Sequence, residues 1–403
     1  PLVYYYIAYG DQNLHRKENT EQANCYMTMY VTLGENAAAD GCFPHRTEDY
    51  IVLKSLAEEY HLAMAYYYLG CLLYDRRVYD ESIEDYEESI LRSPDFPTVH
   101  RNLALAYYNV KKLPQRAYEE MEKAFALDET DARVYLELDQ LKKRLNVAVK
   151  ERWSDMEKHF DLVESRDDLY LEYVTLLNTL GEPEKALGLI KARKFHQWEG
   201  GEGKVAAQYL TALYQLAKAA VEKEDYAEAK ELLLRAVGEY PHNLGEGKLE
   251  SGQENNLYYL LGLVQEKLGE AKDAFESLTR ACCGESEPVG MMYYNDQPPE
   301  MIYYQGLAYR MLGEEEQAVR RFQKLVDYGR EHIRDDVKID YFAVSLPDLL
   351  IFEENLNERN RKHCLFMMSL GLKGLGRIDE AEKCAEELLA MDNAHQEIRV
   401  HDL

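Results

Sequence analysis

The sequence predicts an all-α fold, a right-handed solenoid of antiparallel helix pairs with long inter-repeat loops on one edge. Three observations predict it. A pattern of large, small and aromatic residues recurs over about 34 residues, which is typical of helical repeats. The turns within repeats stay short and contain glycine, whereas the connections between repeats grow longer along the chain. We therefore expect some eight helix pairs and no β-sheet domain.

The first clear repeat shows how one helix pair is built. Leu69 and Gly70 fall on one helix face, while Ser82 and Tyr86 fall on its partner helix. Small residues at 70 and 82 let the two backbones approach closely, and the larger residues fill the space beside them. Pro94 ends the second helix because proline lacks the N–H group and clashes with the preceding turn.

The pattern returns six more times, and each return carries a small residue on its second helix. These residues are Ala117, Ala186, Ala229, Ala274, Ala318 and Ala381. Residues 131–165 match a degenerate copy. We expect residues 1–60 to form an N-terminal cap of two or three helices, residues 61–165 to form repeats including the degenerate copy, and residues 166–403 to form repeats with long inserts.

Turns within repeats differ from connections between repeats. Gly181, Gly269, Gly313 and Gly376 each follow a first helix and can take the left-handed C-cap conformation. The shared alanine moves from 186 to 229, 274, 318 and 381, in steps of 43, 45, 44 and 63 residues. Against about 34 for a bare repeat, each step carries an insertion.

Four inserts, residues 194–204, 241–256, 284–300 and 329–361, should therefore lie on one edge as neighbours. Their aromatic rings could cover the C–H faces of a sugar, and their carboxylates and amides could bind its hydroxyl groups. The alternative is that the aromatics pack the inserts against one another or onto another domain. Candidate binding residues on this loop edge are His196, Trp198, Glu199, Asn243, Glu254, Asn255, Tyr294, Asn295, Asp296, Asp340 and Asp348.

The most specific expectation concerns convergence of the inserts. Trp198, Asn243, Tyr294, Asp296 and Asp340 are predicted to meet in one concave patch, as in a ligand site. The four letters Gly-Glu-Gly-Lys occur at 201–204 and again at 245–248. Neither copy matches a phosphate-binding P-loop, so we interpret both as a repeated turn that caps a helix.

A second candidate surface is the concave groove formed by the first helices of the pairs. By repeat register it presents Tyr67, Tyr74, Arg101, Tyr108, Asn109, Tyr259 and Tyr303. Tyrosine and arginine are typical of interface hot spots. The alternative is simple packing between repeats, in a chain that has 33 tyrosines.

Composition argues against several functional classes. The formal net charge of -27 disfavours nucleic acid and anionic membrane surfaces as partners. Seven scattered cysteines form no Cys-x-x-Cys pair, so we expect reduced thiols, a cytoplasmic location and no metal. No catalytic residue and no cofactor can be assigned. The chain opens at Pro1 in what reads as mid-helix sequence, so we expect that its true N-terminus is missing.

The residues from Tyr66 to Pro94 resemble tetratricopeptide repeats, and the resemblance covers most of the chain. Four segments more closely resemble the C-terminal tetratricopeptide tail of a family of long bacterial proteins: 96–104, 196–204, 293–299 and 340–348. In that family the tail follows a β-rich domain of unknown function similar to parts of carbohydrate-active enzymes. The resemblance implies a missing upstream domain and supplies no functional residue.

Two functions follow from these observations. The first is a non-catalytic scaffold that binds a protein, a peptide or an adjoining domain through its groove and its loop edge, with side chains fixed before the ligand arrives. The alternative is the tail of a carbohydrate-active enzyme, whose inserts complete or cover the sugar site of the upstream domain. On this chain alone we expect no enzyme activity.

Overall fold

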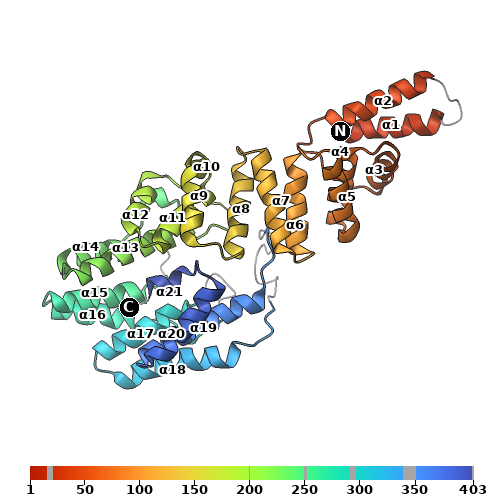
Figure 1. The fold of residues 1–403 in the computed structure, drawn as a ribbon. Coiled ribbons are helices and arrows are strands. Elements are labelled where there is room, and N and C mark those ends of the chain that lie inside the picture. Colours follow the sequence, from red (N-terminus) through yellow and green to blue (C-terminus); the bar gives the residue numbers. More distant parts are fainter. Residues whose placement is uncertain (16–20, 199, 249–251, 291–295, 339–350, 402–403) are drawn as a thin grey trace. The chain divides into compact units, whose positions relative to one another are not determined.

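The structure is a computed structural model that describes residues 1–15, 21–198, 200–248, 252–290, 296–338 and 351–401. These residues form α-helices and one short 3₁₀ helix, with no β-strand among them (Figure 1). The predicted all-α repeat fold is confirmed. By its contacts the chain divides into two compact units, which we describe separately: the first unit is residues 1–141 with 351–353, and the second unit is residues 142–350 with 354–403.

The first unit contains three helices and then repeat pairs. Its helices are α1 (Leu2–His15), α2 (Glu21–Asn36), α3 (Thr47–Tyr60), α4 (Ala63–Asp75), α5 (Tyr79–Arg92), α6 (Pro97–Asn109), α7 (Pro114–Leu127) and α8 (Ala132–Arg144), within which the division between the units falls. Helices α4 and α5 pack as one pair, and α6 and α7 as the next.

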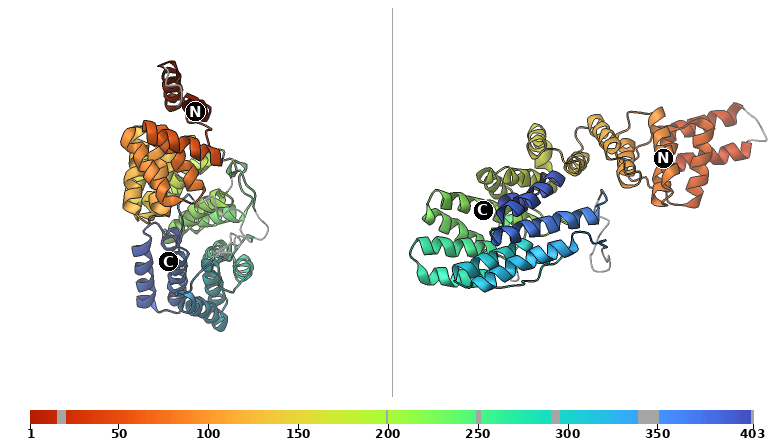
Figure 2. Two further views of the ribbon diagram at one scale, coloured as in Figure 1. Left: turned by 90° about the vertical axis from the view of Figure 1, so that its right-hand side faces the viewer. Right: turned by 60° about the horizontal axis from the view of Figure 1, so that its bottom comes forward.

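The second unit continues the alternation of first and second helices. Its helices are α9 (Val149–Lys158), α10 (Phe160–Ser165), α11 (Asp167–Thr179), α12 (Pro183–Ala192), α13 (Lys204–Glu222), α14 (Tyr226–Val237), η1 (His242–Leu244), α15 (Asn255–Lys267), α16 (Ala271–Ala281), α17 (Pro299–Met311), α18 (Glu315–His332), α19 (Leu356–Gly374), α20 (Ile378–Met391) and α21 (Gln396–Val400). In both views of Figure 2 the C-terminal end lies among the helices of this unit.

Small residues bring the two helices of a pair together, as the sequence predicts. A Cβ atom on Gly70 would lie 2.5 Å from the ring of Tyr86 on the partner helix. The Ser82 hydroxyl donates a 2.7 Å hydrogen bond to the Gly70 carbonyl. Gly306 meets the ring of Phe322 in the same way. Any larger side chain at these glycines would push the paired helices apart.

The turn inside each pair uses one left-handed residue. Gly181, Gly269, Gly313 and Gly376 have φ between 74° and 81°, which confirms the predicted C-caps. Non-glycine residues hold the equivalent place in the other four turns: Arg77, Lys112, Asn146 and Glu224, with φ between 54° and 61°. The turn geometry therefore persists even where glycine is absent.

Candidate functional site

The inner face of α6 in the first unit contacts a short segment from far along the chain. The Asn109 side-chain amide donates to the Ile351 carbonyl at 2.9 Å, and its Oδ1 accepts from the Glu353 backbone N–H at 2.9 Å. The Tyr108 ring packs on Phe352 with centroids 5.1 Å apart and planes at 71°. The Lys112 ammonium donates to the Glu353 carboxylate at 2.6 Å. A side chain of α6 thus binds main-chain atoms on both sides of Phe352.

Two predicted groove residues, Tyr108 and Asn109, therefore lie at one site, and a third lies beside them. Tyr74 on α4 is within hydrogen-bonding contact of Asn109, and burial raises the pKa of its phenol. Lys112 was missed by the sequence analysis because it is one exposed lysine in a turn. The only sequence signal is its position, the residue of the turn that in other repeats is a left-handed glycine. We call Tyr74, Tyr108, Asn109 and Lys112 the α6 site.

Other predicted groove residues of the first unit serve packing between its helices. Tyr67 is buried and meets Phe96 edge to face, with ring centroids 5.0 Å apart. Arg101 makes two 2.7 Å hydrogen bonds to the carboxylate of buried Glu137 on α8. This pairing raises the pKa of Arg101 despite its burial. Both side chains hold the repeats together and are not presented to a partner.

The corresponding face of the second unit is occupied by its own C-terminal residues. The hydroxyls of Tyr214 and Tyr304 are 2.6 Å apart, and the Tyr304 hydroxyl lies 3.1 Å from His401 Nδ1. Tyr259 packs on Tyr304 at a ring-centroid distance of 5.5 Å. Tyr303, the predicted groove residue, is instead buried against Phe322 of α18. The neighbouring Tyr304 therefore takes the place expected of Tyr303.

Helix α21 completes this filling. The Gln396 amide donates to the Thr175 carbonyl and the Thr179 hydroxyl, both at 3.1 Å. Lys218 donates to the Val400 carbonyl at 2.9 Å. Gln396, Ile398, Val400 and His401 are all buried. Tyr259 and Tyr303 therefore do not line an open groove.

Loops 194–204 and 241–256 contact each other through the chain's backbone. The Phe195 N–H donates to the Asn243 carbonyl at 2.9 Å. Glu246 accepts from the Gly203 and Ala206 amides at 2.7 and 2.8 Å, at the start of α13. The second Gly-Glu-Gly-Lys copy thus caps the helix that follows the first copy, and Gly203 and Gly245 are left-handed. The first copy thus begins a helix as predicted, whereas the second copy is a turn that caps α13 and not the helix that follows it, α15.

The amides predicted to bind a ligand on the loop edge bind carbonyls at helix ends instead. Asn243 donates to the Ile190 and Arg193 carbonyls at 2.7 and 2.9 Å, at the end of α12. Asn255 donates to the Ala281 and Cys283 carbonyls at 2.8 and 2.7 Å, at the end of α16. Carbonyls in the last turn of a helix have no partner within the helix, so these amides satisfy the ends of α12 and α16.

The remaining loop-edge residues differ in what they contact. Glu254 is buried and pairs with Lys248 at 2.8 Å. His196 is exposed and binds Asp167 through its backbone N–H at 2.8 Å. Trp198 is half-buried with its ring over Gly201, and Asp296 is half-buried. Glu199, Tyr294, Asn295, Asp340 and Asp348 lie outside the described residues, so the convergence of the five residues stays a prediction.

Comparisons with known proteins find helical repeats in part of the sequence. The tetratricopeptide-repeat family profile matches residues 67–132 and 214–288, and a second profile of the same description matches residues 300–328. These three stretches of the chain match tetratricopeptide repeats. The chain is similar to the solved structure of MamA, with 17% sequence identity over 65% of this chain and 95% of that chain, and a TM-score of 0.19. It is also similar to that of YrrB, titled a TPR protein with an unusual peptide-binding site, with 15% identity over 57% of this chain and 89% of that chain, and a TM-score of 0.20. A third similar structure is that of Naa15/Naa10 bound to HypK-THB, with 9% identity over 96% of this chain and 58% of that chain, and a TM-score of 0.38.

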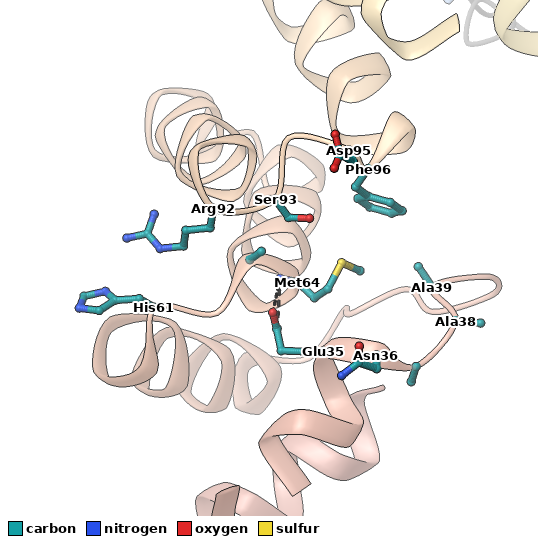
Figure 3. Close-up of a pocket in the computed structure, with 12 residues that line it drawn as sticks. Glu35, Asn36, Ala38, Ala39, His61, Met64, Arg92, Ser93, Asp95 and Phe96 are labelled. Atoms are coloured by element: carbon teal, nitrogen blue, oxygen red, sulfur yellow. Dashed lines mark hydrogen bonds between the residues drawn. The ribbon is translucent and has the colours of Figure 1, made fainter. Parts of the chain in front are cut away.

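One hollow lies among the end of α2, the start of α4 and the residues at and after the end of α5 (Figure 3). Its volume is about 560 Å³, and it is lined by Ala37, Ala38, Ala39, His61, Met64 and Phe96 among others. Glu35 at its wall accepts from the Met64 N–H at 3.1 Å and from the Tyr5 hydroxyl at 2.6 Å. The Glu35 carboxylate is therefore used to join α2 to the start of α4, and Asp95 is the second carboxylate that lines the hollow.

Metal ligation, membrane crossing and the buried histidine His363 are three further properties of the described part of the chain. Within it, no group of three or more His, Cys, Asp or Glu side chains is placed to hold a metal ion. None of the described helices combines the length and the apolar character needed to cross a membrane. His363 donates to the Val289 carbonyl at 2.8 Å, and burial lowers its pKa to about 4. This histidine is a packing group that joins α19 to loop 284–300.

Proposed function

We propose that the chain is a non-catalytic scaffold that binds a short non-helical segment of a protein partner at the α6 site. One observation carries the proposal: the amide of Asn109 makes both an N–H···O=C and an N–H···Oδ1 hydrogen bond to the main chain of Ile351–Glu353. Main-chain atoms are common to all polypeptides. A site that binds them is suited to peptide capture and offers no reacting group.

The rest of the α6 site supports this role. Tyr108 gives an aromatic face for an apolar side chain, and Tyr74 holds the Asn109 amide in place. Such a site is preorganised, because its groups are fixed by their own helices before a ligand arrives, which reduces the entropy lost on binding. The tetratricopeptide helices supply the rigid frame.

We propose the loop edge as a secondary surface that contacts an adjoining domain. Exposed His196 and the half-buried Trp198 and Asp296 are its remaining candidates in the described residues. Asn243 and Asn255 are engaged by helix-end carbonyls and leave few amide groups for sugar hydroxyls. The alternative function is that of a carbohydrate-active enzyme's tail, and an assay of glycan hydrolysis with the longest available form of the protein tests it.

The test uses a library of acetylated eight-residue peptides and the full chain carrying Phe352→Ala, which weakens the internal occupant. We expect a subset of peptides to bind. Adding Asn109→Ala should then weaken that binding about tenfold, because two hydrogen bonds are lost. Asn13→Ala is the matched control, since that exposed asparagine bonds only to its own helix. Absence of any peptide binding, or binding indifferent to Asn109, contradicts the proposal.

A further inference from the structure

We infer that the α6 site selects an aromatic residue followed by a carboxylate, and that Ile351–Glu353 is an internal occupant which a partner of this chemistry displaces. The inference rests on the proposed function and adds to it a sequence preference and a form of regulation. It is drawn from three features of the contact: the position of Phe352, the position of Glu353 and the small size of the interface.

The preference for an aromatic residue follows from where the two main-chain hydrogen bonds lie. They bind the carbonyl before Phe352 and the N–H after it, so the residue between them is fixed in register. Its side chain is 0% exposed and contacts the Tyr108 ring edge to face. Aromatic pairs of this geometry are worth about 0.5–1.5 kcal/mol beyond the area they bury. An alanine in this register would leave the Tyr108 face uncovered.

The preference for a carboxylate follows from Lys112. Its left-handed φ of 54° turns the chain between α6 and α7, and its ammonium reaches Glu353 at 2.6 Å. Both side chains are 64% exposed, so the pair contributes little affinity. The pair does favour an acidic over a basic residue at the position of Glu353, because a second ammonium group there would be repelled by Lys112. The chain's net charge of -27 makes a local cation necessary for an acidic segment to approach.

The segment Ile351–Glu353 makes few enough contacts with the α6 site to dissociate from it. Among the described residues of this part of the chain, three engage the site; Ile351 is half-buried and Glu353 is exposed. The segment nevertheless belongs to the same chain, so its effective concentration at the site is on the order of millimolar. If the segment itself has an intrinsic affinity of about 100 μM, a partner peptide would bind the intact chain roughly tenfold more weakly than it binds an opened chain, in which a substitution such as Phe352→Ala has weakened the internal contact.

The experiment titrates the labelled, acetylated peptide Ile-Phe-Glu-Glu-Asn, which copies residues 351–355, into the full chain. We expect Phe352→Ala to bind it at least tenfold more tightly than the unmodified chain does. Glu353→Lys, a change at an exposed position, should act in the same direction by a smaller factor and guards against misfolding of the first variant. Phe275→Ala, which removes an exposed phenylalanine of the second unit, is the control.

Two altered peptides test the preference on the opened chain. Replacing the peptide's phenylalanine by alanine should weaken binding about tenfold, and replacing its first glutamate by lysine should weaken it about threefold. With Lys112→Glu the order of the parent peptide and the lysine-containing peptide should reverse. Lys111→Glu is the matched control, because that lysine pairs with Asp80 instead. Binding without any of these preferences overturns the inferred selectivity.

Two further outcomes overturn internal occupancy. One is equal affinity of the labelled peptide for the unmodified chain, the Phe352→Ala chain and the Glu353→Lys chain. The other is an unmodified chain that sediments as a dimer and becomes a monomer on Phe352→Ala, which would place the segment in the site of a second copy. In either case the peptide still binds and the proposed function survives. Failure of every library peptide instead removes the proposed function itself.

Discussion

Both units hold part of the C-terminal half of the chain on a face that tetratricopeptide helices line, but they hold it differently. The second unit buries α21, with Gln396, Ile398 and His401 all enclosed among its helices. The first unit holds three residues, of which only Phe352 is fully buried. We conclude that α21 is an integral part of its unit, whereas Ile351–Glu353 occupies a site that can be vacated.

The largest expected effect comes from breaking the buried contact. Ile398→Asp places a charge among buried residues and should destabilise the second unit by about 3–5 kcal/mol. Arg399→Asp introduces the same residue at the adjacent exposed position of α21 and should change stability by less than about 1 kcal/mol. Chemical denaturation of both variants measures the difference. Equal effects would show that α21 is not integral to the unit.

The stability effects of two asparagine substitutions, one in each unit, compare the two units directly. In the second unit the Asn393 amide donates to the Asn146 and Val147 carbonyls, at 2.6 and 3.3 Å. Asn393→Ala should cost about 1–3 kcal/mol, because it orphans carbonyls of a tight turn. Asn109→Ala should cost less than about 1 kcal/mol, because the freed segment can bind water. Denaturation midpoints that rank the two variants in the opposite order would contradict the comparison.

Acid should weaken the second unit through His401. Burial lowers its pKa from 6.5 to about 3, so between pH 6.5 and 3 the unfolded chain binds a proton that the folded chain does not. Stability is therefore lost as pH falls through this window, by about 2 kcal/mol at pH 5 for this group. His401→Gln should remove that part of the pH dependence. The measurement is the change in unfolding free energy between pH 7 and pH 5 for the unmodified chain and for His401→Gln. Identical changes in the two proteins would contradict the role given to His401.

The smallest effect is expected at Lys112. Its ion pair with Glu353 is exposed on both sides, so Lys112→Ala should change stability by less than about 0.5 kcal/mol. The same substitution should reduce the salt dependence of peptide binding to the opened chain, because screening acts on exposed pairs. A large loss of stability would mean that the α6 site is a structural joint.

Much of the fold could be predicted from local pattern. Gly70 and Ser82 mark where two helices approach, and the turn glycines are left-handed as expected, because both depend on neighbouring residues. The return of α21 to the inner face could not be predicted, since Gln396 and its partner Thr175 are far apart in sequence. Tyr303 and Tyr304 show a further limit: a one-residue change of register exchanges a core side chain for an inner-face one.

The candidate site was predictable only in part. Repeat register selects Tyr108 and Asn109 because both lie on the inner face of a first helix. Their ligand, Ile351–Glu353, carries no local signal of where it packs. On the loop edge, composition predicts Asn243 and Asn255 as ligand-binding residues, and in the structure both donate to backbone carbonyls at helix ends. Composition cannot distinguish a ligand's hydroxyls from helix-end carbonyls, because an amide donates equally well to either.

Hydrogen exchange of the intact chain tests the central claim most directly. The Glu353 amide donates to Asn109, and the His401 amide donates to the Glu397 carbonyl within the buried C-terminal end. We predict that the Glu353 amide exchanges through local opening, and faster still when the Ile-Phe-Glu-Glu-Asn peptide is added. The His401 amide should exchange only as the second unit unfolds and ignore the peptide. Equal protection of both amides, unchanged by the peptide, would contradict the distinction between an exchangeable occupant and an integral one.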